Sequence, residues 1–328
     1  MPAERGSATG VTSTPLAGSA VSFSGAGAVS GRGLPDAADT LGADPFRRRK
    51  KRLLRTARGA IIASTLSTLV VIGGIVVAFL LAPGSRQVRS VYFDAHDMWQ
   101  AFLGNPHAGF YSVGEGLVIN IEMFMIGEVL ILALALVIAL IRQSKSPLLF
   151  PLRGLAIAYV DFFRGVPLIL VILAIGFGLP ALYLPVVSSQ SAFVYGVVAL
   201  VLSYSAYVSE VYRAGFNSVP HSQIASARSL GLRPRTAMRH VVLPQAVRTI
   251  IPPLLNTFVS LQKDTALVAV LGAVIEANRA AEIYSSTVFN YSGYTVAAIL
   301  FLLLTIPLAR FTDHLIARDR SRRLAGVT

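Results

Sequence analysis

Long apolar runs alternate with short polar segments along most of this chain. Each of the six longest runs has more than 20 residues, enough at ~1.5 Å per residue for a helix to cross ~30 Å of hydrocarbon. They cover residues 59–82, 116–141, 155–179, 192–212, 250–273 and 293–317. The pattern therefore predicts an all-α polytopic membrane protein with six transmembrane helices.

The polar segments between these runs differ in positive charge. Lys and Arg are concentrated in residues 47–58, 142–153, 213–248 and 310–323, which six spans would place on one side of the membrane. Because cytoplasmic loops carry an excess of Lys and Arg, that side is predicted to be cytoplasmic. Both termini then face the cytoplasm, and the protein is predicted to be a multi-pass protein of the plasma (cytoplasmic) membrane.

The composition divides the chain further. Residues 1–46 are rich in Gly, Ala, Ser and Pro, a composition typical of a disordered tail. Residues 47–115 hold a basic segment, the first span and an external loop, and residues 116–317 form the main transmembrane domain. Residues 318–328 form a short basic cytoplasmic tail.

Overall composition excludes several classes of protein. With 54% hydrophobic residues, 14% charged residues and a mean hydropathy of +0.64, an ordinary soluble domain is excluded. The net charge is +13, and the Lys and Arg residues that cause it cluster beside the apolar runs. They therefore indicate how the chain is oriented in the membrane, and they do not indicate a nucleic-acid partner. The chain has no cysteine, so it can form neither disulfides nor thiolate metal sites.

No common catalytic motif occurs in the sequence. A P-loop requires a Lys directly after Gly, but none of the four lysines follows a Gly. The chain also lacks H-E-x-x-H and G-x-S-x-G motifs. The chain is therefore not predicted to be an enzyme, and it is not predicted to hydrolyse ATP itself.

Several ionisable residues fall inside the predicted spans, where charge is costly. Glu128, Arg164 and the neighbours Lys263 and Asp264 lie near the predicted midplane. They are candidates for lining a solute path, and the alternative is that they only pair with one another to hold helices together. Glu210 and Arg213, three residues apart on one helix face, are predicted to form a structural ion pair.

The segment 210–272 is polar and rich in Arg between two apolar runs, and it carries the clearest motifs. Ala225-Ser226-Ala227, three residues, Gly231, nine residues and then Val241-Val242-Leu243-Pro244 keep the spacing of the E-A-A, G, I-x-L-P motif of ATP-binding-cassette (ABC) importer permeases. F-R-G-x-P-L at 163–168, E-x-x-R-A-G at 210–215 and K-D-T at 263–265 also resemble that family. The chain thus resembles the permease subunit of polar amino-acid ABC importers, most of all the glutamate/glutamine type, over about residues 114–323.

The chain departs from this family pattern inside the motif. Ala225 replaces the motif's glutamate, Ser226 replaces its first alanine, and Ser222 stands where glycine is common. In the family that glutamate helps to fix the contact with the ATPase. The resemblance therefore predicts that docking is kept but that one ion pair or hydrogen bond is absent.

The resemblance implies a type I ABC importer permease bundle with a cytoplasmic coupling helix at 219–240 inside the loop 214–247. Two permease chains would pair, separate ATPase subunits would bind ATP and dock on these helices, and an external binding protein would deliver the amino acid. No cofactor is expected in this chain itself. The implied ATPase-coupling residues are Ser222, Gln223, Ala225, Ser226, Ala227, Leu230 and Gly231.

Two other classes remain open from the sequence. A stand-alone secondary transporter or channel would normally show two related halves, and no such repeat is visible. A membrane scaffold or sensor whose cytoplasmic segment recruits a partner would have no use for charges at the midplane.

Overall fold

The computed structural model describes the backbone of residues 45–325 and the side chains of residues 60–318 and 321. The chain divides into two units, residues 1–76 and 77–328. In the first unit the described residues belong to helix α1 (Pro45–Leu81), whose residues Ala60–Leu81 are apolar and long enough to cross a membrane. This agrees with the predicted span 59–82. The predicted disordered tail lies almost wholly outside the described residues.

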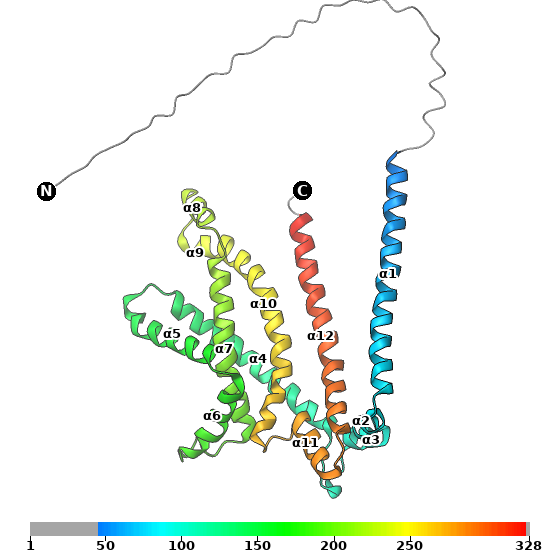
Figure 1. Cartoon of the computed structure of the whole chain (residues 1–328). Helices are drawn as coiled ribbons and strands as arrows, with labels where there is room; N and C mark the ends of the chain where they lie inside the picture. Colours follow the sequence, from blue (N-terminus) through cyan, green and yellow to red (C-terminus); the bar gives the residue numbers. More distant parts are fainter. Residues whose placement is uncertain (1–44, 326–328) are drawn as a thin grey trace, which may run out of the picture. The chain divides into compact units, whose positions relative to one another are not determined.

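The second unit is built from helices, and the described residues contain no strand (Figure 1). Its α-helices are α2 (Ser85–Tyr92), α3 (Ala95–Leu103), α4 (Val113–Gln143), α5 (Phe150–Gly165), α6 (Leu168–Ala181), α7 (Ala192–Asn217), α8 (His221–Ser229), α9 (Pro234–Ala237), α10 (Leu243–Asp264), α11 (Ala277–Val288) and α12 (Ser292–Ala325). Short 3₁₀ helices are η1 (Pro106–Ala108), η2 (Pro147–Leu149) and η4 (Thr265–Leu271), and η3 (Met238–Val242) is a π-helix.

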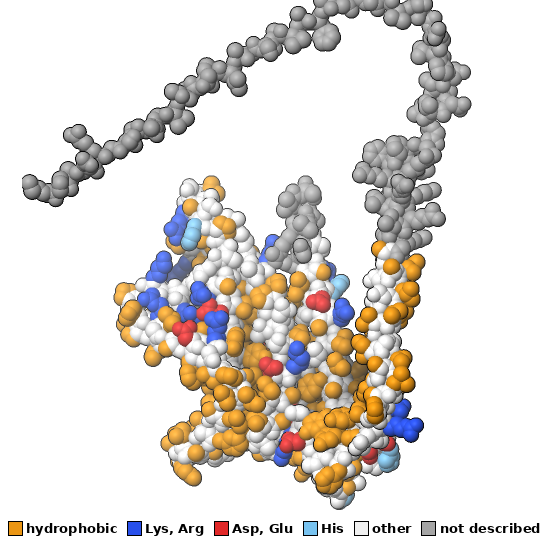
Figure 2. Space-filling view, in the orientation of Figure 1, with side chains coloured by type: hydrophobic (Ala, Val, Ile, Leu, Met, Phe, Trp, Pro, Cys, Tyr) orange, Lys and Arg blue, Asp and Glu red, His pale blue; other side chains and the backbone are white. Residues whose placement is uncertain are grey.

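Helix α7 is the centre of this unit and packs against α4, α5, α6 and α10. It begins where the Ser191 side chain caps the helix by accepting a hydrogen bond from the Val194 N–H at 3.4 Å. Its buried side chains form the main hydrophobic core with residues of α4, α6, α10 and η4. On the face of the unit that Figure 2 shows, hydrophobic side chains are widespread, and several Lys and Arg side chains lie around α5 and α8. Such a surface suits a bundle surrounded by lipid.

The predicted count of six spans is supported only in part by the described helices. In the part of the chain that the structure describes, four helices are long and apolar enough to cross a membrane, namely Ala60–Leu81, Val113–Gln143, Ala192–Asn217 and Ser292–Arg318. Each overlaps one predicted span. The other two predicted spans, 155–179 and 250–273, are not single continuous helices. Counting the bent pair Pro147–Gly165 and Leu168–Ala181 as one span gives five, so the predicted count of six is not confirmed.

The predicted span 155–179 is a bent pair of helices. The segment Pro147–Gly165, with α5, and helix α6 meet at an angle of 109°. Pro167 is the N-cap of α6 and Val166 before it is extended. Proline cannot donate a backbone hydrogen bond and disfavours helical geometry in the preceding residue, which accounts for the break at this point.

The predicted span 250–273 also changes from an α-helix to a 3₁₀ helix along its length. Helix α10 ends at Asp264, and the chain continues as the 3₁₀ helix η4 until Gly272, which has a φ of +72°. Pro252 and Pro253 lie within α10, which passes through them without ending. Helix α10 carries many polar side chains, and it is less apolar than the four helices that could cross a membrane.

The segment 219–240, predicted as one coupling helix, is two helices. Helix α8 ends at Ser229, and α9 begins at Pro234. Gly231 between them has a φ of +77°, its N–H donates to the Arg228 carbonyl at 2.9 Å, and the Leu232 N–H donates to the Ala227 carbonyl at 3.2 Å. These two bonds form a Schellman motif, in which glycine is favoured because it adopts positive φ without strain. The motif glycine therefore ends the helix.

A buried polar anchor joins α4 to the start of α11. The Asn120 amide donates to Glu276 Oε2 at 2.9 Å and to Thr265 Oγ1 at 3.1 Å, and its oxygen accepts from the Ala277 N–H at 3.0 Å. Glu276 is fully buried and caps α11 through the N–H groups of Asn278 and Arg279. Burial raises the pKa of the Glu276 carboxyl, and the hydrogen bonds from its neighbours oppose that rise.

Candidate functional site

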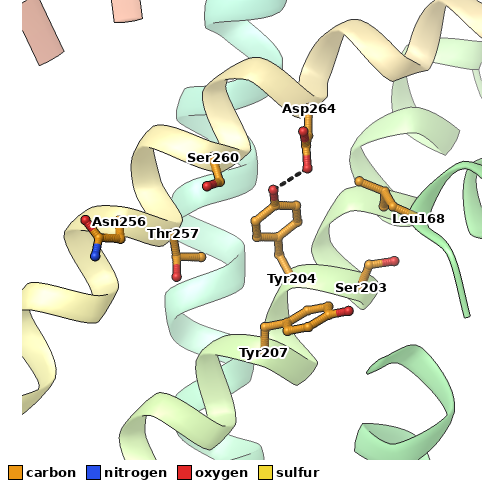
Figure 3. Close-up of a pocket in the computed structure, with 8 residues that line it drawn as sticks. All are labelled: Leu168, Ser203, Tyr204, Tyr207, Asn256, Thr257, Ser260 and Asp264. Carbon is orange, nitrogen blue, oxygen red and sulfur yellow. Dashed lines mark hydrogen bonds between the residues drawn. The ribbon is translucent and has the colours of Figure 1, made fainter. Parts of the chain in front are cut away.

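A cavity lined mostly by polar side chains lies between α7 and α10, beside the break between α5 and α6. Its volume is about 340 Å³, within the range of small-molecule sites. Helix α7 contributes Ser203, Tyr204 and Tyr207, helix α10 contributes Asn256, Thr257, Ser260 and Asp264, and α6 contributes its first residue, Leu168 (Figure 3). We call this space the α7–α10 cavity.

Two details show how the α7–α10 cavity is built. The Tyr204 hydroxyl donates to Asp264 Oδ2 at 2.6 Å, which fixes the carboxylate at the wall of the cavity (Figure 3). Ser203 is only 2% exposed, and its hydroxyl has no hydrogen-bond partner among the described residues. Buried polar atoms are normally hydrogen-bonded, so the Ser203 hydroxyl is an exception in the wall of the cavity.

The four ionisable residues predicted for a solute path occupy different places. Asp264 lines the α7–α10 cavity. Its neighbour Lys263 is exposed and is not part of the cavity lining. Glu128 lines a second cavity, of about 400 Å³, whose other lining residues from α4, α10 and α12 are apolar except Thr312. The structure therefore does not bring Glu128 and Asp264 into one pocket.

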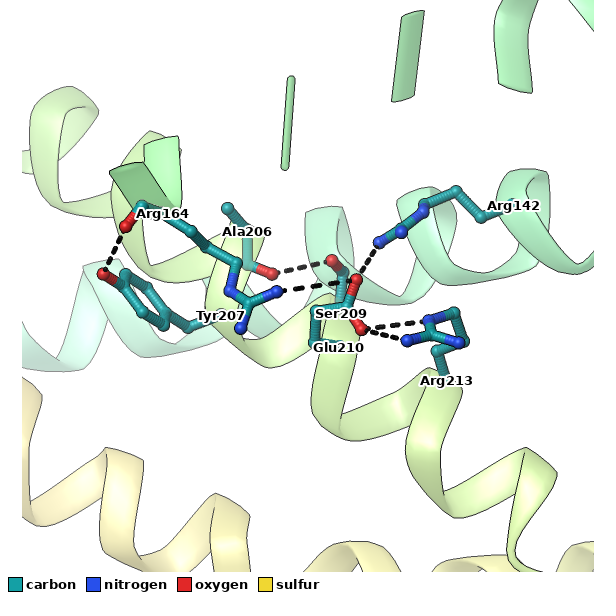
Figure 4. A network of polar contacts seen from close by, with 7 residues as sticks. All are labelled: Arg142, Arg164, Ala206, Tyr207, Ser209, Glu210 and Arg213. Atoms are coloured by element: carbon teal, nitrogen blue, oxygen red, sulfur yellow. Dashed lines mark hydrogen bonds and ion pairs between the residues drawn. The ribbon is translucent and has the colours of Figure 1, made fainter. Parts of the chain in front are cut away.

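Arg164, the fourth of these residues, belongs to an ion cluster around Glu210 (Figure 4). Arg142 of α4 donates to Glu210 Oε1, and Arg213 donates to Glu210 Oε2 at 2.6 Å through Nη2. The Arg164 guanidinium lies 3.9 Å from Oε1. The Glu210–Arg213 pair predicted from spacing is thus present, but three arginines from three helices share this one carboxylate.

Arg164 also contacts Tyr207, which lines the α7–α10 cavity. Its guanidinium carbon lies 5.9 Å from the centre of the Tyr207 ring, and its backbone carbonyl accepts from the Tyr207 hydroxyl at 3.3 Å. Tyr207 thus lines the cavity and also contacts Arg164 of the Glu210 cluster. Among the residues that the structure describes, no group of three or more His, Asp or Glu side chains is placed to hold a metal ion.

Helix α8 presents most of the predicted coupling residues at its surface. Ser222, Gln223, Ala225 and Ser226 are exposed, and Leu230 just after the helix is 82% exposed although it is a large apolar residue. Ala227 points inward instead and is only 5% exposed. The small-residue motif therefore divides between an outer face and one buried packing position.

The sequence reasoning missed most of the cavity-lining residues. Asn256, Ser260 and Asp264 recur every four residues within the apolar run 250–273, which places them on one helix face. This spacing could have been used to predict a polar face on the helix. The residues of α7 gave no such signal, because which face of α7 meets α10 is decided only by tertiary packing.

Comparison with known proteins places the chain in a family. Residues 131–321 match the family described as the inner membrane component of binding-protein-dependent transport systems. The probable glutamine ABC transporter permease protein GlnM of Bacillus subtilis (strain 168) is 38% identical over 165 residues, covering 50% of this chain and 74% of the relative. The probable amino-acid permease protein YxeN of the same organism is 38% identical over 189 residues, covering 57% and 82%.

A solved structure agrees with this placement. The crystal structure of an amino acid ABC transporter with histidines is similar with a TM-score of 0.58 at 31% sequence identity, covering 63% of this chain and 93% of that chain. The region of similarity includes the helices that line the α7–α10 cavity and the segment containing α8. The chain therefore belongs to the family of inner-membrane components of binding-protein-dependent transport systems.

Proposed function

We propose that this chain is the permease subunit of an ABC importer that moves polar amino acids into the cell, with the glutamate/glutamine type favoured by the sequence. The observation that carries the proposal is the α7–α10 cavity, whose lining side chains are polar except Leu168 and include one carboxylate. Polar groups at membrane depth are costly unless they serve a path or a site. The names of the relatives GlnM and YxeN support an amino acid as the solute.

The proposed mechanism is alternating access around this cavity. Separate ATPase subunits bind and hydrolyse ATP, and their closure and opening move two paired permease chains between inward-open and outward-open states. An external binding protein delivers the amino acid. The break between α5 and α6 beside Leu168 and the change from α10 to η4 after Asp264 offer two places where such a movement can be absorbed.

We propose that α8 is the docking element for the ATPase. Its side chains Ser222, Gln223, Ala225 and Ser226 are exposed, and the helix ends just before the exposed Leu230. Exposed apolar side chains with small neighbours allow a partner surface to approach closely and exclude water. In this proposal the α8 end of the bundle and both termini face the cytoplasm.

Leu230→Asp is expected to weaken ATPase docking, because it places a charge in the apolar centre of the proposed contact. A loss of about 1.4 kcal/mol of binding free energy would reduce affinity about tenfold. The measurement is the amount of ATPase that co-purifies with the tagged permease from membranes.

Two variants act as controls for this experiment. Tyr183→Asp alters an 88% exposed apolar side chain outside α8 and should retain the ATPase. Ala225→Glu restores the family's motif residue on the exposed face of α8 and should retain or increase it. Full recovery of ATPase with Leu230→Asp would contradict docking through α8.

Uptake tests the proposed solute class. In a strain lacking this gene, complementation should restore uptake of labelled amino acids, and glutamate, glutamine, arginine, histidine and cystine are compared as competitors. If no amino acid competes, the proposed solute class is wrong. If uptake continues after deletion of the partner ATPase gene, the chain works as a stand-alone transporter.

A further inference from the structure

A third cavity, of about 510 Å³, lies between α8, η3 and the C-terminal ends of α4 and α7. We call it the α8 cavity. Its lining is apolar except for Gln143, Asn217 and His221, and it shares no lining residue with the α7–α10 cavity. We infer that the α8 cavity holds an acyl chain of an anionic phospholipid, whose headgroup lies at these three polar residues.

The α8 cavity changes from apolar to polar along α4. Leu136, Leu140 and Gln143 line it in succession on one face of the helix, over ~10 Å at ~1.5 Å per residue. Leu136 and Leu140 are 40% and 54% exposed, so this wall is open along the apolar span. At the other end the Gln143 amide donates to Asn217 Oδ1 at 3.3 Å. Burial of an acyl chain against the leucines is favourable, and the polar side chains can bond to a headgroup.

The chain segments around the α8 cavity are strongly basic. Residues 211–263 include six arginines and one lysine and no Asp or Glu, and residues 129–160 include three basic residues and no acid. Glu210 on α7 is already shared by three arginines. Figure 2 shows several Lys and Arg side chains around α8. Basic pockets between membrane helices bind anionic headgroups, so the charge favours an anionic lipid over a zwitterionic one.

The α8 cavity and the proposed ATPase contact use different parts of the α8 surface. His221 and Ile224, three residues apart on the helix, line the cavity, whereas the exposed Gln223 and Ser226 do not. A lipid in the cavity would contact α8, α4 and α7 together. It is therefore expected to hold α8 in place while the outer surface of α8 stays accessible.

Photo-crosslinking locates the lipid on the unchanged protein. The purified protein is placed in phosphatidylcholine nanodiscs that contain a small amount of phosphatidylglycerol or phosphatidylcholine with identical chains, one of which carries a diazirine. Mass spectrometry then measures the crosslinks to Leu136, Leu140 and Met238, which line the cavity. Phosphatidylglycerol is expected to crosslink there at least about fivefold more than phosphatidylcholine, which corresponds to about 1 kcal/mol.

Exposed apolar residues of α12 provide the control within the same sample. Leu302 and Leu303 are 55% and 66% exposed and do not line the α8 cavity. They are expected to contact whichever lipid is nearby. The two probes should therefore crosslink equally to these two residues.

Two substitutions test the charge at the polar end of the cavity. His221→Glu and Gln143→Glu each place a negative charge among the polar lining residues, so each should lower the preference for phosphatidylglycerol about fivefold. His314→Glu makes the matching change at an exposed position of α12 outside the lining and should leave the preference unchanged. Melting temperatures of the three variants check that each remains folded.

Equal crosslinking of the two lipids at the cavity residues would overturn the inference, and so would a preference of the same size at Leu302 and Leu303. A preference that both His221→Glu and Gln143→Glu leave unchanged would also contradict it. Displacement of the probe by oleate but not by unlabelled phosphatidylglycerol would assign the cavity to a fatty acid instead. The experiment uses neither ATPase nor solute, so these outcomes are independent of the proposed transport function.

Discussion

Glu210→Gln is expected to lower the stability of the purified protein by about 3 kcal/mol, the lower end of the cost of breaking a buried ion pair by removing one partner. Arg142 is only 11% exposed, and the Glu210 carboxylate is its acidic partner. Without that charge, a guanidinium from α4 is left nearly buried against α7. The melting temperature should fall by about 6–12 °C, at about 2–4 °C per kcal/mol for a domain of this size.

Two further variants show whether the buried charge is the cause. In the double variant with Arg142→Gln, no uncompensated buried guanidinium remains at position 142, so part of the lost melting temperature should return. Glu282→Gln removes the acid of the more exposed pair with Arg279 on α11, and the effect should stay within about 1 kcal/mol. Equal melting temperatures for Glu210→Gln and Glu282→Gln would contradict a central structural role for the cluster.

Gly116→Ala is expected to destabilise the protein by about 2–3 kcal/mol, although alanine is the better helix former. A Cβ atom at position 116 would lie 2.6 Å from the Ala277 nitrogen and 2.7 Å from the Glu276 carbonyl carbon. Both contacts are with backbone, which cannot turn away as a side chain can. The substitution would therefore separate α4 from α11 beside the Asn120–Glu276 hydrogen bond.

Gly127 is the matched control, because it lies in the same helix, is buried, and would place a Cβ atom with no neighbour within 4 Å. Gly127→Ala should leave the melting temperature unchanged or raise it slightly, since replacing Gly in a helix interior gains up to about 1 kcal/mol. The two alanine variants thus have opposite expected signs. A loss with Gly127→Ala as large as that with Gly116→Ala would show that α4 tolerates no added methyl group at all.

Four of the six predicted hydrophobic runs coincide with single apolar helices among the described residues. Helices α1, α4, α7 and α12 each match a predicted run, because a helix in lipid must satisfy its own backbone and shows this need as an unbroken apolar stretch. The length of a hydrophobic run does not show whether the helix bends within that run. Pro167 signalled the α5–α6 break, but Pro252 and Pro253 lie in a helix that continues, so proline alone does not locate breaks.

Whether a polar contact could be predicted depends on how far apart its two residues lie in the sequence. Glu210–Arg213 could be predicted because three residues separate them on one helix. Arg142 reaches Glu210 from 68 residues away, and Asn120 reaches Glu276 from 156 residues away. Such pairs depend on which helices pack together, and a single sequence does not contain that information in readable form.

The candidate site was partly predictable for the same reason. Asp264 could be identified as a charge inside a predicted span, and its cavity neighbours Asn256 and Ser260 follow the helical repeat of α10. Charge alone could not sort the other candidates. Glu128 faces a different cavity and Arg164 faces Glu210, because each helix has its own rotation about its axis.

ATP-driven transport in a purified system tests the central proposal most directly. The permease, its ATPase and the binding protein are reconstituted in vesicles, and accumulation of a labelled mixture of polar amino acids is followed with and without ATP. We expect accumulation only with ATP, and we expect Leu230→Asp to reduce it about as strongly as it reduces ATPase co-purification. Accumulation that proceeds without the ATPase, or that Leu230→Asp leaves unchanged, would contradict the account.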